Sequence, residues 1–173
     1  MRRNRGGKGD DSSGDMKGPV YLRLGRENVP PITDEKKAFT PGKAHIIKQG
    51  KDLTVIACGI MVYHAILAAE MLEKAGVSAG VINLHTIKPI DIEAIVGQAR
   101  RTGAIVTAEE HLTAGGMGSA VSEVLSQNLP VPVEMVGVKD RFGESGSPWE
   151  LMKKLHLMPE DIVEAAKRVI NRK

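Results

Sequence analysis

Short apolar runs alternate with helical patterns along most of the chain. The runs that predict strands cover residues 44–48, 53–58, 80–84, 103–108 and 131–138. Apolar residues at helical spacing, with Pro, Asp or Ser at the starts of several segments, predict helices over residues 62–72, 91–99, 117–127, 147–155 and from 159 towards the C-terminus. Asp91 is the predicted N-cap of the second of these helices. Strands and helices that alternate at these lengths specify a mostly parallel sheet with helices on both faces. The predicted fold is therefore a three-layer α/β/α unit with about five strands.

The first two predicted strands are separated by a four-residue loop that contains Gly50. A loop of this length and composition predicts a β-hairpin between residues 44–48 and 53–58. We therefore expect one antiparallel strand at an edge of the sheet.

The chain before residue 44 has a different composition. Residues 20–24 predict a further strand, but prolines and a charged run between residues 27 and 43 are typical of a linker, so we place a domain boundary there. Residues 1–17 are rich in Gly, Ser, Asp and Arg, with two methionines as the only larger apolar residues. Such a segment cannot bury enough surface to offset its ordering entropy, so it is predicted to be a disordered tail.

Composition excludes several classes of protein. The 173 residues are 42% hydrophobic but only 3% aromatic, which predicts a soluble protein with an aliphatic core. The net charge of +3 comes largely from residues 1–17, and the remaining 19 basic and 18 acidic residues nearly balance, which argues against a nucleic-acid surface. A solvated tail is the simplest interpretation of the basic excess, and contact with RNA or an acidic partner is the alternative.

We identify no secretory signal and no run that could span a bilayer, and Cys58 is the single cysteine, so a cytoplasmic location is expected.

Glycines follow the strand predicted at residues 103–108. Gly115, Gly116 and Gly118 form a GGxG turn that opens a helix, where backbone N–H groups can bind a phosphate. The spacing differs from the GxGxxG fingerprint of dinucleotide-binding proteins, and no suitably placed acidic residue follows the next strand to hold a ribose hydroxyl. We therefore favour a tight turn that packs the helix closely on the sheet over a phosphate site.

Two polar segments carry the other candidate site residues. Glu109 and His111 lie at the carboxyl end of a predicted strand, where open α/β sheets bind ligands, and we expect them to share a face. Such a pair can shuttle a proton or ligate a metal, and a hydrogen-bonded loop or subunit contact is the alternative. Arg141 and Glu144 lie in the loop after the last predicted strand, where Ser145 matches only part of the GxSxG nucleophile elbow. An interface is predicted for this loop.

Several ordered motifs together resemble the C-terminal part of transketolase. They are GPVYLRLGR at residues 18–26 followed by Val29-Pro30, LTVIACG at 53–59, HTIKPID at 85–91, VTAEEHLTAGGMGSA at 106–120 and DRFGESG at 140–146. The resemblance covers residues 18–173. The FGESG loop favours transketolase over its relatives deoxyxylulose-phosphate synthase and the β subunit of 2-oxo acid dehydrogenases.

The resemblance implies a domain organisation and an activity. Residues 18–43 correspond to the last strand of a pyrimidine-binding domain plus a linker, and residues 44–173 to the transketolase C-terminal domain. The complete enzyme is expected to be a homodimer of pentose phosphate metabolism that uses thiamine diphosphate and Mg²⁺ to move two-carbon ketol units between sugar phosphates. The alternatives are the same domain of deoxyxylulose-phosphate synthase and a stand-alone dimerisation or binding module.

Arg26, in the LGREN motif, corresponds to the family arginine that binds the sugar phosphate, a role that suits the planar fork of a guanidinium. A surface contact is the alternative role for this side chain. The metal and diphosphate motifs of the family, and its catalytic glutamate, have no counterpart in this sequence. The resemblance therefore predicts no catalytic residue and no metal or cofactor site within this chain, inactivity on its own, and association with the remaining transketolase domains or an N-terminal subunit. No membrane or nucleic-acid partner is expected.

Overall fold

The computed structural model describes residues 17–19, 30–32 and 39–173. The chain divides into two units, Met1–Pro41 and Gly42–Lys173, and every described strand and helix lies in the second. The predicted tail, apart from Lys17, and the strand predicted at residues 20–24 lie outside the described residues. No helix within the described ranges is long and apolar enough to cross a membrane.

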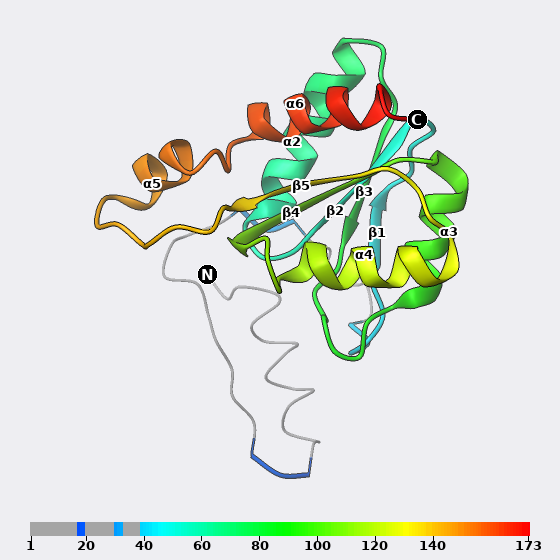
Figure 1. The fold of residues 1–173 in the computed structure, drawn as a ribbon, viewed down its shortest axis with the longest axis horizontal. Helices are drawn as coiled ribbons and strands as arrows, with labels where there is room; N and C mark the ends of the chain where they lie inside the picture. Colours follow the sequence, from blue (N-terminus) through cyan, green and yellow to red (C-terminus); the bar gives the residue numbers. More distant parts are fainter. Residues whose placement is uncertain (1–16, 20–29, 33–38) are drawn as a thin grey trace. The chain divides into compact units, whose positions relative to one another are not determined.

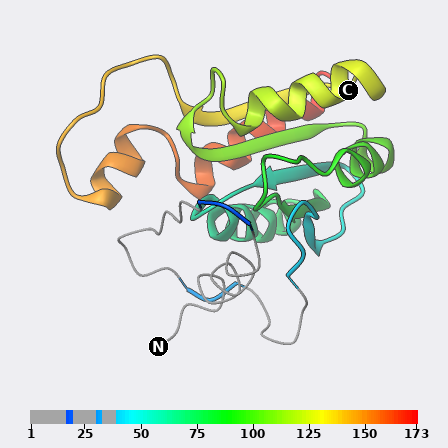
Figure 2. The ribbon, with the colours of Figure 1, turned by 90° about the horizontal axis from the view of Figure 1, so that it is seen from below.

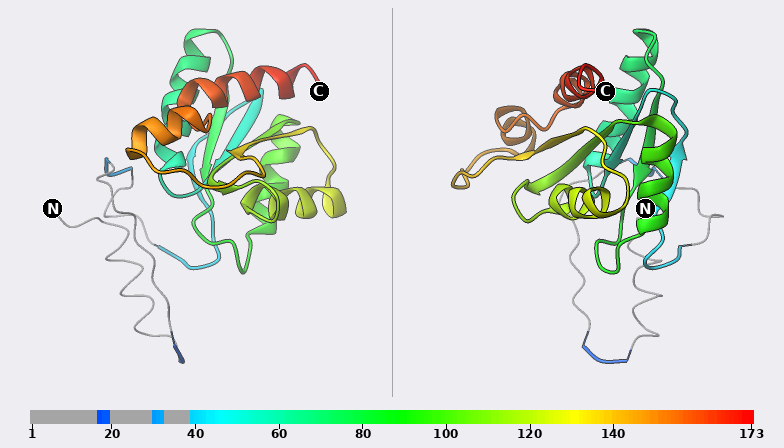
Figure 3. Two further views of the ribbon diagram at one scale, coloured as in Figure 1. Left: turned by 60° about the vertical axis from the view of Figure 1, so that its left-hand side comes forward. Right: turned by 45° about the vertical axis from the view of Figure 1, so that its right-hand side comes forward.

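The second unit is a three-layer α/β/α fold, as predicted (Figure 1). Its strands are β1 (His45–Lys48), β2 (Leu53–Ala57), β3 (Ala79–Asn83), β4 (Ile105–Leu112) and β5 (Val133–Val138). Its helices are α2 (Met61–Lys74), α3 (Ile92–Thr102), α4 (Met117–Asn128), α5 (Pro148–Lys154) and α6 (Pro159–Ile170). Helices α2 and α6 pack together on one face of the sheet, and α3 and α4 pack on the other, as the views of Figure 3 show.

The sheet is mixed, with strand order β1-β3-β2-β4-β5. The pairs β2–β3, β2–β4 and β4–β5 are parallel, and β1 is the antiparallel edge strand. The aliphatic core that the composition predicts is also present. Its largest fully buried apolar side chains are Leu53, Ile56, Met61, Leu72, Ile82, Leu84, Ile95, Ile105, Leu125, Leu157 and Ile162.

The predicted hairpin between the first two strands is wrong. Strand β1 pairs with β3, in the register His45 to Asn83, and not with β2. The connection crosses the start of β3 instead of turning back: the backbone N–H groups of Lys51 and Asp52 both donate to Ser78 O, at 3.0 Å each. Gly50 permits this crossing, because a Cβ there would overlap with the β3 backbone. The prediction of an antiparallel edge strand is therefore confirmed, but its neighbour in the sheet is a different strand.

Strand β4 extends four residues beyond its predicted end at residue 108. Its pairing with β5 shifts register between Ala108 and Leu112, and Leu112 then pairs with Val138. Because the shift breaks the simple alternation of side chains, the polar residues beyond Ala108 do not follow the two-residue period of the strand.

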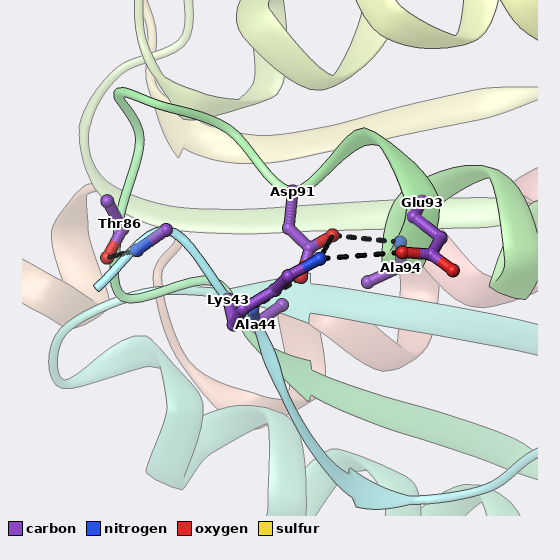
Figure 4. Close-up of polar contacts among 7 residues, drawn as sticks. Lys43, Ala44, Thr86, Asp91, Glu93 and Ala94 are labelled. Atoms are coloured by element: carbon purple, nitrogen blue, oxygen red, sulfur yellow. Dashed lines mark hydrogen bonds and ion pairs between the residues drawn. The ribbon is translucent and has the colours of Figure 1, made fainter. Parts of the chain in front are cut away.

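Asp91 joins the start of the second unit to the turn before α3 (Figure 4). Its carboxylate is the predicted N-cap of α3, accepting from Ala94 N at 3.2 Å, and it also accepts from Ala44 N at 2.9 Å. Lys43 Nζ lies 3.7 Å from the Asp91 carboxylate and 3.4 Å from that of Glu93. With an exposed fraction of only 7%, Asp91 fixes the point at which the chain enters β1.

We expect Asp91→Ala to lower the free energy of unfolding by about 2 kcal/mol, since the helix loses its cap and the Ala44 N–H loses its acceptor. Urea denaturation measures the effect. The matched control is Glu93→Ala, because the Glu93 side chain is 89% exposed and its pair with Lys43 should contribute less than about 0.5 kcal/mol. Equal losses in the two variants would contradict the role assigned to Asp91.

Candidate functional site

The candidate residues lie where parallel strands end. Cys58 follows β2, Glu109 and His111 lie in the last part of β4, and residues 139–147 follow β5. The switch point of the sheet lies between β2 and β4. From β2 the chain continues to β3 on one side of β2, and from β3 it crosses to β4 on the opposite side of β2. The carboxyl ends of strands beside such a point are where open α/β sheets bind ligands.

Glu109 is buried, with 2% of its surface exposed. Its Oε2 accepts a hydrogen bond from Met117 N at 2.6 Å, and its Oε1 accepts one from Gly118 N at 2.8 Å. Both carboxylate oxygens thus satisfy backbone N–H groups of the first turn of α4, which would otherwise lack acceptors. The carboxylate is held in place by the helix and stabilises its N-terminus.

His111 lies in a different environment from Glu109, against the expectation that the two share a face. The His111 side chain is exposed, and its Nδ1 lies 3.1 Å from Leu112 O. The register shift in β4 between Ala108 and Leu112 accounts for the difference, because both residues lie within it. Among the described residues there is no group of three or more His, Cys, Asp or Glu side chains that could hold a metal ion. The geometry therefore favours a structural role for Glu109 over a proton shuttle with His111.

The loop after β5 is organised by charge. Glu144 forms ion pairs with Lys154 of α5 and with Arg141. The pKa of Glu144 is lowered from its ordinary value, because the hydrogen bond from Lys154, the largest cause, together with the charges of Lys154 and Arg141 outweighs the opposing effect of burial. Phe142, next to Arg141, is 96% exposed. The loop thus presents an aromatic side chain on a turn closed by ion pairs, and its role as an interface stays a prediction.

Helix α5 continues from this loop and stands apart from the sheet (Figure 2). It is held to α2 by Trp149, whose ring stacks on that of His64 with centroids 6.0 Å apart and an interplanar angle of 26°. His64 is buried, and its Nδ1 lies 2.8 Å from Leu157 O. The sequence pattern does not reveal this contact, because nothing local links residues so far apart.

Cys58 has a raised pKa, of about 11. Burial is the largest cause, and the negative charges of Glu109 and Glu110 add to it. The thiol is therefore poorly ionised at neutral pH.

Arg26 lies outside the described residues, so its role as a phosphate ligand remains a prediction. Within the described part of the chain, the candidate loops hold no assembled set of nucleophile, base and orienting group.

Comparison with known proteins identifies the family. Residues 42–162 match the family described as "Transketolase, C-terminal domain". The chain belongs to this family.

The relatives of this transketolase C-terminal domain include separate subunits of transketolases. The chain is 49% identical over 156 residues to the 6-deoxy-6-sulfo-D-fructose transketolase subunit SqwH of Clostridium sp. (strain MSTE9), covering 90% of this chain and 48% of the relative. It is 43% identical over 149 residues to one subunit of the apulose-4-phosphate transketolase of Phocaeicola vulgatus, covering 86% and 47%. The 1-deoxy-D-xylulose-5-phosphate synthase of Heliobacterium modesticaldum is 37% identical, with 90% of this chain and 24% of the relative covered.

A solved structure described as "Split gene transketolase, inactive beta4 tetramer" shares the fold. It superimposes with a TM-score of 0.90 at 47% identity, over 94% of this chain and 54% of that one. The chain thus spans about half the length of the transketolase subunits that it resembles.

We expect Cys58 in the folded protein to react with a disulfide reagent at pH 8 at least tenfold more slowly than in urea, because its raised pKa leaves little thiolate. The absorbance of the released thiol measures the rate. The folded pKa also exceeds the unfolded one, so the contribution of this group to stability is complete below about pH 9 and is lost as the pH rises through about 11. Cys58→Ala should remove this part of the alkaline pH dependence. Equal labelling rates in the folded and unfolded protein would contradict the assignment.

Proposed function

We propose that this chain is the C-terminal part of a thiamine diphosphate-dependent transketolase that transfers two-carbon ketol units between sugar phosphates. The observation that carries the proposal is the family match over residues 42–162, together with relatives named as transketolase subunits at 49% and 43% identity. The 49% identity to the sulfofructose transketolase subunit favours transketolase, and deoxyxylulose-phosphate synthase, with relatives at 37% and 42% identity, is the alternative. In this proposal residues 18–43 belong to the end of a pyrimidine-binding domain and its linker, and residues 44–173 are the C-terminal domain. The assembled enzyme acts in pentose phosphate metabolism in the cytoplasm.

In this proposal the described residues do not hold the cofactor. They contain no group of three metal-ligating side chains, and the candidate loops use their charges on one another and on a helix N-terminus. In the complete enzyme, thiamine diphosphate and Mg²⁺ supply the carbanion chemistry, and we assign their binding to other domains. The role of the described domain is then structural: it supports the assembly that forms the active site.

A partner is required by this proposal. The solved relative at 47% identity is described as inactive in a tetramer of its β chain, which supports inactivity of the present chain alone. The proposed partners are the remaining transketolase domains or an N-terminal subunit, and a second copy of this chain. Phe142 is the side chain best placed for contact with the N-terminal subunit, since a phenylalanine with 96% exposure contributes most when a partner covers it.

We expect the chain alone to show no ketol transfer and no saturable calorimetric binding of thiamine diphosphate with Mg²⁺. Ketol transfer should appear when the chain is joined to the rest of the pyrimidine-binding domain and mixed with the N-terminal subunit, measured by coupled assay with sugar phosphates as donor and acceptor. Full activity of the chain alone would overturn the proposal, and so would inactivity of a complex whose formation is verified by gel filtration.

The same mixing experiment tests the role of Phe142. Phe142→Ser should raise the concentration of N-terminal subunit needed for half-maximal activity by roughly tenfold to a hundredfold, because the buried area of one aromatic ring is lost. Met71→Ser is the matched control, since Met71 on α2 is also exposed, at 38%, but lies on a different element. An equal effect of both variants would remove Phe142 from the interface.

Arg26 is proposed to bind the phosphate of the sugar. Arg26→Ala in the assembled enzyme should raise KM for phosphorylated acceptors roughly tenfold to a hundredfold, as charge-assisted hydrogen bonds are lost. Arg26→Lys should restore part of the loss, because an ammonium group cannot present the planar fork. An unphosphorylated donor serves as the control, and equal losses with both kinds of substrate would indicate a structural role.

A further inference from the structure

The turn between β4 and α4 has the geometry of an anion-binding turn, and an anion of the same chain lies in it. The backbone N–H groups of Met117 and Gly118 point towards one carboxylate, that of Glu109, at 2.6 and 2.8 Å. N–H groups at the first turn of a helix bind phosphate, sulfate or carboxylate, because they lack partners within the helix and the helix dipole favours negative charge. Here both N–H groups are occupied by the side chain of Glu109, which precedes them in the same chain.

Three glycines leave room for this carboxylate. A Cβ at Gly116 would overlap with Glu109 Oε2, and one at Gly118 would lie 3.2 Å from Oε1. Gly137 of β5 borders the same side chain, because a Cβ there would lie 3.3 Å from Glu109 Cγ. The bound carboxylate is thus one of the groups that require glycine at positions 116 and 118, and the chain itself is its source.

Thr107 provides a second, independent indication of an anion site. Its side chain is fully buried, and its Oγ1 has no hydrogen-bond partner. A Cβ at Gly118 would lie 2.6 Å from this oxygen, so the hydroxyl borders the first turn of α4 beside the two N–H donors. A carboxylate with two oxygens uses the two N–H groups, whereas a tetrahedral oxyanion could also accept the Thr107 hydroxyl.

We propose that the β4–α4 turn is an oxyanion-binding site whose resident ligand is Glu109. The side chain closes the turn to free phosphate and sulfate, so the GGxG pattern gives this domain no phosphate site while Glu109 is present. Removal of the carboxylate opens a site with three donors, the N–H groups of Met117 and Gly118 and the hydroxyl of Thr107, that binds inorganic phosphate or sulfate. The proposal does not depend on the proposed enzymatic function.

The test compares thermal unfolding of the full chain in chloride, phosphate and sulfate at equal ionic strength. Wild type should gain only the general stabilisation that phosphate and sulfate give to folded proteins relative to chloride. Glu109→Ala should lower Tm in chloride by about 5–10 °C, because two charge-assisted hydrogen bonds are lost. Phosphate or sulfate in excess over its dissociation constant should restore about half of that loss. The amide resonances of Met117 and Gly118 should move saturably with phosphate in this variant and not in wild type.

Glu110→Ala is the matched control, since it removes the same charge from the exposed neighbouring position. Its gain in Tm from phosphate over chloride should equal that of wild type. Thr107→Val in the Glu109→Ala background should weaken phosphate binding about tenfold, as one donor is lost. The proposal is overturned if Glu109→Ala gains no more from phosphate than Glu110→Ala does, or if wild type gains equally. If Glu109→Ala does not fold in chloride, folding in phosphate supports the proposal, and failure in both salts overturns it.

Discussion

The central strand β2 is completely buried, and the arrangement of the sheet follows from that constraint. All five of its residues lie in the core, between β3 and β4 and beneath helices on both faces. Because β3 and β4 occupy both sides of β2, the chain that precedes β2 cannot pair with it. That chain crosses the start of β3 and forms the edge strand β1 instead. The same centre defines the switch point between β2 and β4, and therefore the edge of the sheet where Cys58 and Glu109 come close enough for the Glu109 charge to affect the thiol.

Most of the fold follows from periodicity alone. The alternation of strands and helices, the aliphatic core and the N-cap at Asp91 all depend on local patterns, and they agree with the structure. The false hairpin shows where this reasoning ends. A four-residue loop with glycine is equally compatible with a turn and with a crossing, and the choice depends on the contact of Gly50 with the β3 backbone, which no local pattern contains.

The candidate site is less predictable than the fold for the same reason. A GGxG turn after a strand predicts an anion, and the pattern is the same whether the anion is a ligand or a side chain of the protein. The position of Glu109 at a strand end is clear from the sequence, but its burial and its bonds to α4 depend on where that helix packs, which the strand pattern does not contain. Phe142 lies in the loop predicted as an interface, although the sequence does not indicate how fully the ring is exposed.

The residues that stabilise the described domain are different from those assigned to partner contact and substrate binding. Glu109 and Asp91 are buried carboxylates that hold helix N-termini, and each loses its function if it moves to solvent. Phe142 is the reverse case, because an exposed aromatic ring contributes little until another surface covers it. Arg26, which the family resemblance connects with substrate, precedes the unit that carries the described fold. A domain built in this way can remain folded while the sugar chemistry of the proposed enzyme changes around it, which fits relatives named for sulfofructose, apulose phosphate and deoxyxylulose phosphate.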